Sequence, residues 1–136
     1  MVAIIDATGA VLGRLASVVA KRLLNGEEII IVNSEKAIIT GDKQSIKERY
    51  KEKRELGTQR KGPFFPRMPD KIVKRTIRGM LPYQTPHGRA ALKRLKCYIG
   101  VPEEFNGKEM EKIGLEKMPL KYITIEELSR HLGAKI

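Results

Sequence analysis

Apolar residues in the first third of the chain follow a strand pattern, then a helical one, then a strand pattern again. Residues 2–5 and 28–32 form short apolar runs, which are typical of strands buried in a sheet. Between them, Thr8 or Gly9 is expected to cap a helix that Asn25-Gly26 ends. Its apolar stripe consists of Leu12, Leu15, Ala16, Val19 and Leu23. Such a strand–helix–strand unit predicts an α/β fold with parallel strands.

The pattern that follows predicts a short strand and a polar helix. Residues 37–40 are expected to form the strand, but only residues 33–36 connect it to the strand before it. Because a parallel crossover needs a longer connection, this strand either pairs antiparallel or leaves the main sheet. The helix is expected over residues 42–54, capped by Asp42, with Ile46 and Tyr50 on its buried side.

Glycines and prolines divide the rest of the chain. Residues 56–69 contain two glycines and three prolines, which predicts an extended loop. The elements expected next are a helix over 70–81, a turn at 85–88, a short helix that ends at 95 and a strand over 97–99. Last come an acidic stretch over 101–117, expected to be mobile or held on the surface, a strand over 122–124 and a helix over 125–132 that Gly133 ends. We expect one domain, 1–136.

Charge is distributed unevenly along the chain. The 136 residues carry 27 Lys and Arg against 16 Asp and Glu, a net charge of +11. Residues 56–100 hold eleven of the basic side chains and a single acid, Asp70. Such a segment repels itself unless a polyanion neutralises it, so we expect nucleic acid as the partner. A merely basic surface and an anionic membrane surface are the less favoured alternatives.

Nothing in the sequence indicates an oxidising compartment or a membrane. The only cysteine, Cys97, cannot form an internal disulfide. No apolar run approaches the roughly 18 residues of a membrane span, and residues 1–6 lack the features of a secretion signal. We therefore expect a cytoplasmic protein with no membrane partner.

The predicted helix over residues 70–81 is both amphipathic and basic. At 100° per residue, its four cations fall within an arc of about 100°. They are Lys71, Lys74, Arg75 and Arg78, and the opposite side carries Val73, Ile77, Met80 and Leu81. A solvated helix face usually mixes Glu with Lys, whereas no acid follows Asp70 here. Phosphate binding is therefore favoured over an ordinary charged surface.

Two further basic groups flank this helix. Arg89, Lys93 and Lys96 have the spacing of one helical face, with Leu92 and Leu95 pointing inward. In the loop before the helix, Arg60, Lys61 and Arg67 surround Phe64-Phe65. Such a loop could enter an RNA crevice with an aromatic ring stacked on a base. Alternatively, both phenylalanines fill the core beneath the loop.

Enzymatic interpretations fail for lack of the required residues. Residues 57–62 have the glycine spacing of a phosphate loop, but Pro63 stands where the lysine is needed. Asp6 ends a strand, where a carboxylate more often caps the next helix than catalyses a reaction. His87, His131 and Cys97 are far apart and do not make a metal site. We expect no enzyme, cofactor, metal or small-molecule substrate.

Four motifs resemble one known family, the universal large-subunit ribosomal protein thirteen family. They are Asp6 to Gly9 with Leu12 to Ser17, Val32 to Lys36 with Ile39 to Gly41, Arg78 to Pro82, and Gly88 to Lys96. Together they cover roughly residues 2–102 in order. Gly62 to Pro69 is similar to the archaeal and eukaryotic forms, and the eukaryotic C-terminal extension is absent, so the type is archaeal. Residues 103–136 match less specifically.

The resemblance implies a three-layer α/β/α fold around a mostly parallel sheet of about four strands. It also implies binding to large-subunit ribosomal RNA, contact with neighbouring large-subunit proteins and a role in early subunit assembly. An RNA-binding regulator acting away from the ribosome is the alternative. The expected RNA-binding residues are Arg14, Arg60, Lys61, Arg67, Lys71, Lys74, Arg75, Arg78, Arg89, Lys93, Arg94 and Lys96.

Overall fold

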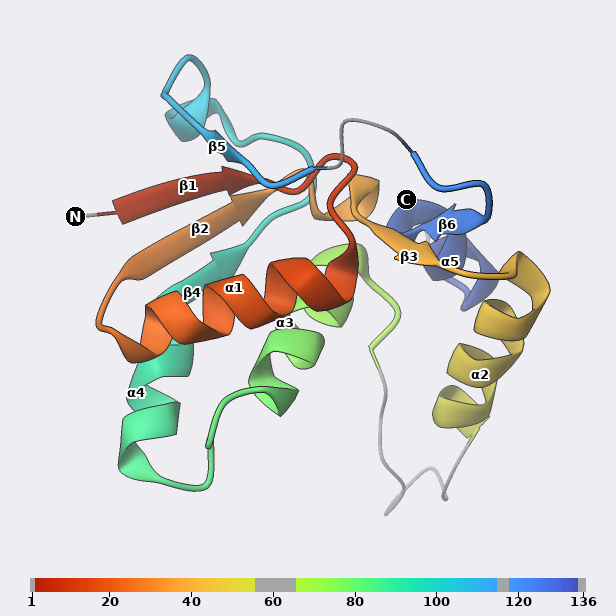
Figure 1. Cartoon of the computed structure of the whole chain (residues 1–136), viewed down its shortest axis with the longest axis horizontal. Coiled ribbons are helices and arrows are strands. Elements are labelled where there is room, and N and C mark those ends of the chain that lie inside the picture. The colour runs from red at the N-terminus through yellow and green to blue at the C-terminus, as the bar shows by residue number, and fades with distance from the viewer. Residues whose placement is uncertain (1, 56–65, 115–117, 135–136) are drawn as a thin grey trace.

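Four parallel strands form the main sheet, in the order β4-β2-β1-β5 (Figure 1). The strands are β1 (Val2–Asp6), β2 (Glu28–Val32), β4 (Leu95–Cys97) and β5 (Glu111–Lys112). This computed structural model describes residues 2–55, 66–114 and 118–134, without the side chains of 52–55. The predicted α/β class with a four-stranded parallel sheet is confirmed. The predicted basic loop over residues 56–69 lies mostly outside the described residues.

The first helix connects β1 to β2 as predicted, but it is capped differently. Helix α1 (Leu12–Leu24) buries all five predicted apolar positions, and Gly26 follows with a positive φ of 96°. The predicted cap at Thr8 or Gly9 is wrong, because the helix starts after Val11 with no side-chain cap. Thr8 instead donates its N–H and hydroxyl to the Asp6 carboxylate, which stabilises the loop after β1.

Alternate residues of the strands enter two separate apolar layers. Ile5, Ile29 and Ile31 belong to the main core, which α1, α3 (Pro69–Gly79) and α4 (Pro86–Lys93) cover from one side of the sheet (Figure 1). Ile4 and Val32 face the other side and pack with Phe105 of the short 3-10 helix η2 (Glu103–Phe105). Because side chains alternate along a strand, both faces of the sheet are apolar, as the continuous apolar runs predicted.

The third strand along the chain leaves the main sheet instead of pairing antiparallel with β2. This decides between the two predicted alternatives. A second 3-10 helix, η1 (Ser34–Lys36), lies between β2 and β3 (Ile38–Thr40). β3 pairs antiparallel with β6 (Tyr122–Thr124), from the far end of the chain. The main apolar core nevertheless includes residues beside both sheets, such as Leu15 and Ile123. One apolar core is thus shared by the two sheets in the described part of the chain.

Two capped helices flank the small sheet, both as predicted. Helix α2 (Lys43–Glu55) follows Asp42, whose carboxylate accepts a hydrogen bond from the Ser45 N–H at 3.2 Å. Its Ile46 and Tyr50 side chains are buried. Helix α5 (Ile125–His131) starts after Thr124, whose hydroxyl accepts from the Glu127 N–H at 3.2 Å. No helix of the described chain is both long and apolar enough to cross a bilayer.

For residues 85–117, two predictions need correction and one open alternative is decided. The expected turn at 85–88 is the start of α4, with Thr85 as its cap and Pro86 in its first turn, a favoured combination. The expected strand over 97–99 lies two residues earlier, over 95–97, because α4 ends at Lys93. The acidic stretch 101–117, expected to be mobile or held on the surface, contains η2 and the edge strand β5, which pairs with β1.

Candidate nucleic-acid interface

Helix α3 has one buried face and one basic face. Ile72, Val73 and Ile77 are completely buried, and the helix packs against α1 and β4. On the other face Lys71 and Lys74 are exposed, and Arg75 and Arg78 are half-buried. The predicted opposition of apolar and basic sides is therefore confirmed. Met80, expected inside, is 44% exposed, because α3 ends at Gly79 and the chain turns away before Leu81.

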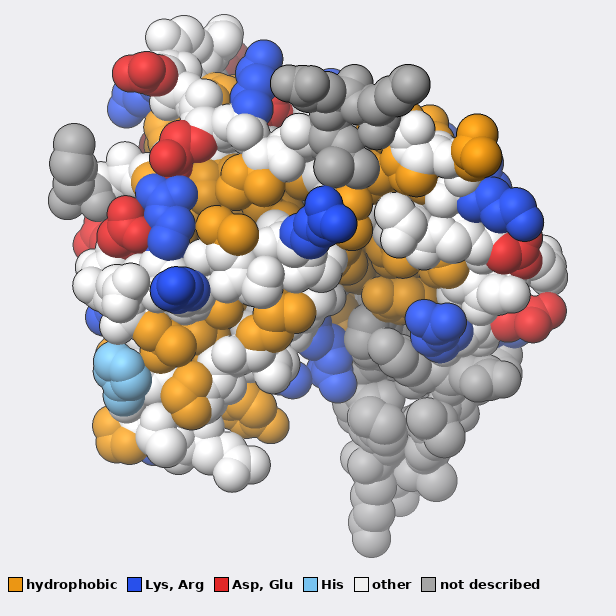
Figure 2. All heavy atoms as spheres, in the orientation of Figure 1, with side chains coloured by type: hydrophobic (Ala, Val, Ile, Leu, Met, Phe, Trp, Pro, Cys, Tyr) orange, Lys and Arg blue, Asp and Glu red, His pale blue; other side chains and the backbone are white. Residues whose placement is uncertain are grey.

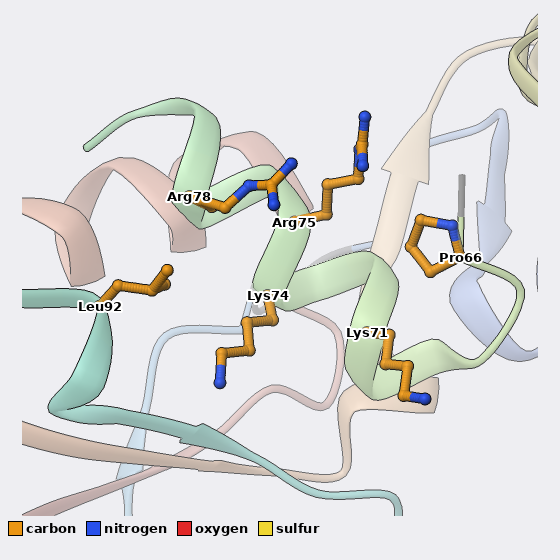
Figure 3. A pocket seen from close by; sticks show the side chains of 6 residues that line it. All are labelled: Pro66, Lys71, Lys74, Arg75, Arg78 and Leu92. Carbon is orange, nitrogen blue, oxygen red and sulfur yellow. The ribbon is translucent and has the colours of Figure 1, made fainter. Parts of the chain in front are cut away.

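The basic face of α3 forms one wall of a groove of about 300 Å³, here called the α3 groove (Figure 3). Its described lining consists of Pro66, Lys71, Lys74, Arg75, Arg78 and Leu92. Pro66 lies at one end and Leu92, from α4, at the other, with the four cations between them (Figure 3). At 1.5 Å per residue, the cations extend along about 10 Å of the helix. Among the described lining residues there is no carboxylate, so the groove is an electropositive site.

A cation–aromatic contact orients one side chain of this groove. The Arg78 guanidinium lies over the Tyr83 ring, 5.2 Å from its centroid. Contacts of this kind hold a guanidinium group against the ring and restrict the rotamers of the arginine side chain. Tyr83 itself is 42% exposed. Arg78 is therefore positioned before any ligand arrives.

The thiol behind the groove is chemically inert. Cys97 lies in β4, and burial raises the pKa of its thiol to about 12, with Lys74 opposing and Asp70 adding to the shift. A thiol with this pKa stays protonated at neutral pH and is a poor nucleophile. Cys97 therefore contributes packing, as expected for a buried cysteine.

The cations predicted on the following helix separate in the structure. Arg89 and Lys93 are exposed on α4, but Lys96 lies in β4 between the inward-facing Leu95 and Cys97. The predicted helical grouping of Arg89, Lys93 and Lys96 is thus wrong. Because strand side chains alternate, Lys96 points to the opposite face of the sheet from α3 and α4.

The remaining predicted cations occupy different surroundings. Arg94 donates a hydrogen bond from Nη2 to the Leu23 carbonyl oxygen at 2.7 Å, which satisfies the end of α1. Arg67 is exposed just before α3, with its guanidinium next to Gly133. Arg14 is exposed on α1. Arg60 and Lys61, together with Phe64 and Phe65, lie outside the described residues.

The carboxyl ends of β1 and β2 carry polar residues with a structural role. The Asp6 carboxylate oxygen Oδ1 accepts hydrogen bonds from the Thr8 N–H at 3.0 Å, the Thr8 hydroxyl at 2.7 Å and Asn33 Nδ2 at 3.0 Å. Burial alone would raise the pKa of Asp6, but these hydrogen bonds outweigh it and lower the pKa below 3.8. Asp6 therefore joins β1 to β2 instead of capping α1. No group of three or more metal-ligating side chains occurs among the described residues.

Acidic side chains occur elsewhere on the surface, beside basic ones. Figure 2 shows red and blue side chains intermingled over the part of the molecule where Figure 1 places β1 and β5. One such contact joins Arg22 Nη1 to Glu111 at 2.8 Å, and another joins Arg22 Nε to Glu27 at 2.9 Å. Mixed charges of this kind neutralise each other, whereas the described lining of the α3 groove contains cations and no carboxylate.

Sequence reasoning missed three residues at this site. Pro66 and Leu92 close the ends of the groove, and Tyr83 orients Arg78. Leu92 was expected to point into the core, but it is half-buried and shared between the core and the groove. No local pattern marks these residues, since they meet α3 only in the folded chain.

The chain matches one protein family over most of its length. A family model described as ribosomal protein L13 matches residues 1–104. The large ribosomal subunit protein uL13 of Archaeoglobus fulgidus is 57% identical over 135 residues, which cover 96% of this chain and 86% of the relative. The protein of the same name from Methanocaldococcus jannaschii is 55% identical over 136 residues, covering 97% and 98%.

These matches also include the C-terminal third, beyond the part that the family model covers. Coverage of 96–97% of this chain by archaeal relatives means that residues after 104 are shared with them as well. The archaeal type inferred from the motifs is thus confirmed. From the family model and the near-complete matches to archaeal uL13 proteins, this chain belongs to the ribosomal protein L13 family.

Proposed function

We propose that this protein is a structural constituent of the large ribosomal subunit that binds large-subunit ribosomal RNA through the α3 groove and contributes to early subunit assembly. The observation that carries the proposal is the alignment of four cations along one groove whose described lining has no carboxylate. Lys and Arg contacts to phosphate oxygens supply most of the affinity of such interfaces. The proposed place of action is the ribosome in the cytoplasm.

Other cations extend the proposed RNA interface around the groove. Arg89 and Lys93 lie on α4, the helix that also supplies Leu92, and Arg67 precedes α3. Arg60 and Lys61 are included from the sequence, as is Arg14 on α1. We assign Arg94 mainly to helix α1, because it donates to the Leu23 carbonyl oxygen in the last turn of that helix. We assign Lys96 to a separate contact on the other face of the sheet, with RNA or a neighbouring ribosomal protein.

The protein is not an enzyme, because its family is one of ribosomal proteins. Two side chains that could in principle react, Cys97 and Asp6, have structural roles instead. The pKa of about 12 keeps the Cys97 thiol protonated, and Asp6 is engaged with Thr8 and Asn33. We therefore assign the aligned cations of the groove to binding.

A pair of double charge reversals tests the proposal. Lys71→Glu/Lys74→Glu changes the groove, and Lys108→Glu/Lys112→Glu makes the same change of charge beside η2 and in β5. The groove variant is expected to bind purified large-subunit RNA at least tenfold more weakly than the control and to be depleted from large subunits when both compete for incorporation. Equal RNA affinity and equal incorporation of the two variants would contradict the proposal.

A further inference from the structure

The α3 groove contains more than phosphate-binding groups. Its two ends are the apolar side chains Pro66 and Leu92, and the methylene stems of the lysines and arginines line the space between them. A phosphate needs only hydrogen-bond donors and would gain nothing from apolar walls. Pockets that hold a planar organic group combine such walls with a few oriented polar groups. The lining therefore suits a base together with its phosphate.

The size of the groove and the position of Arg78 agree with this interpretation. About 300 Å³ lies at the lower end of the range for small-molecule sites and is enough for one nucleotide. The Arg78 guanidinium already lies over the Tyr83 ring, 5.2 Å from its centroid. Unpaired RNA bases stack on guanidinium planes as well as on aromatic rings. A base entering the groove would meet a guanidinium plane that the contact with Tyr83 already restrains.

We propose that the α3 groove binds the unstacked base of a nucleotide that protrudes from an RNA helix, as in a single-nucleotide bulge. The base lies between Leu92 and the guanidinium plane of Arg78, while Lys71 and Lys74 bind the flanking phosphates. This proposal rests on the proposed function and specifies its ligand: RNA with an extruded base rather than uninterrupted duplex. Tyr83 acts as a positioning residue, because it contacts Arg78 but is not itself among the described lining residues of the groove.

The test compares RNA hairpins that differ only in one unpaired nucleotide. The probes are a fully paired hairpin and four hairpins with a bulged A, C, G or U in the same stem, measured with the full-length protein at fixed salt. One bulged hairpin or more is expected to bind about tenfold more tightly than the paired one, the range that stacking of one base supports. With 2-aminopurine as the bulged base, protein binding is also expected to change its fluorescence.

Three variants separate base stacking from charge. Arg78→Lys keeps the positive charge but removes the planar stacking surface. Tyr83→Ala removes the partner that orients Arg78, and Met80→Ala is the control, since Met80 is similarly exposed (44% against 42%) but does not line the groove. Arg78→Lys and Tyr83→Ala are expected to lose most of the preference for the bulge, measured within each variant as the ratio of its affinities for the bulged and the paired hairpin. Met80→Ala is expected to keep the preference.

The outcomes distinguish this proposal from the proposed function. Equal binding of paired and bulged hairpins with a strong salt dependence would overturn base binding and leave the groove as a phosphate-binding surface. A preference for the bulge that survives both Arg78→Lys and Tyr83→Ala would also overturn it, because the base would then lie elsewhere. Absence of binding to purified large-subunit RNA would instead contradict the proposed function.

Discussion

At the scale of single residues, the Asp6 carboxylate links three parts of the chain. Its Oδ1 binds Thr8 in the loop after β1 and Asn33 at the end of β2. Asn33 has a left-handed φ of 55°, and its N–H donates to the Gly100 carbonyl oxygen at 2.9 Å. A substitution of Asp6 therefore affects several hydrogen bonds at once.

Asp6→Asn is expected to lower the free energy of unfolding by about 1–2 kcal/mol at pH 7, because the amide oxygen can still accept the three hydrogen bonds of Oδ1 but lacks the negative charge that strengthens them. The pKa of Asp6 is lowered in the folded protein, so its stabilising contribution is complete above the unfolded pKa near 4 and is lost as the pH falls through the folded pKa. Urea denaturation should therefore give a constant difference between wild type and variant from pH 5 to 7 and a smaller difference below pH 4. A difference that grows on acidification would contradict this role.

Gly88 is required by close contact, not by an unusual backbone angle. A Cβ at this position would lie 1.9 Å from the Pro82 carbonyl oxygen. Gly88→Ala is therefore expected to destabilise the protein by about 2 kcal/mol or more, as overpacking does. Gly13→Ala in α1 is the control: its Cβ meets nothing within 4 Å, so a gain of about 0.4–1 kcal/mol is expected. Thermal unfolding of both variants tests this expectation. Similar shifts of the melting temperature in Gly88→Ala and Gly13→Ala would contradict a steric requirement for glycine at position 88.

At the scale of secondary-structure elements, the groove depends on the short helix α4. α4 supplies Leu92 at one end of the groove and the exposed cations Arg89 and Lys93. A helix of eight residues has little stability of its own, so its cap and its packing against α1 decide whether it forms. Its cap is the Thr85 hydroxyl, which accepts from the Gly88 N–H at 3.2 Å.

Thr85→Ala is expected to cost about 1 kcal/mol of stability, the usual effect of losing an N-cap. Thr85→Ser keeps the hydroxyl and should be close to wild type. Amide hydrogen exchange is expected to locate the loss in residues 86–93 before the rest of the chain. Uniform loss of protection across the described helices would show instead that α4 has no separate dependence on its cap.

At the scale of the whole molecule, the charge is asymmetric. Of the net charge of +11, residues 56–100 contribute +10, whereas around β1 and β5 the two signs are mixed. Part of the mixed surface is paired internally, as Arg22 is with Glu27 and Glu111. A polyanion is therefore attracted mainly from the α3 side, and such attraction is sensitive to ionic strength.

Binding to structured RNA is expected to weaken by roughly 10³ between 50 and 200 mM salt if about six phosphates are engaged. Lys71→Gln/Lys74→Gln should reduce the slope of log affinity against log salt by about 2, because each lost phosphate contact removes about 1. Lys108→Gln/Lys112→Gln should leave the slope unchanged. Filter binding at four or more salt concentrations provides the slopes, and a flat response of the wild type would rule out the electrostatic interface.

Local sequence pattern alone was sufficient for the elements with strong periodicity and clear end signals. The βαβ start, the capped helices α2 and α5 and the two-sided helix α3 follow from short apolar runs, from spacings of 3.6 residues and from end signals. All of these depend only on neighbours in the chain. The four cations of the groove were predicted for the same reason, and the family was identified from motifs within residues 6–96.

Only the tertiary structure decided what depends on distant partners. β5 has just two residues, Glu111 and Lys112, and forms because β1 presents an edge to it. β3 leaves the main sheet because β6, more than eighty residues later, pairs with it. Likewise, Pro66, Leu92 and Tyr83 join the basic face of α3 only through chain folding. Spacing along the sequence determines which face of a helix is basic, but contacts between distant segments determine the groove beside it.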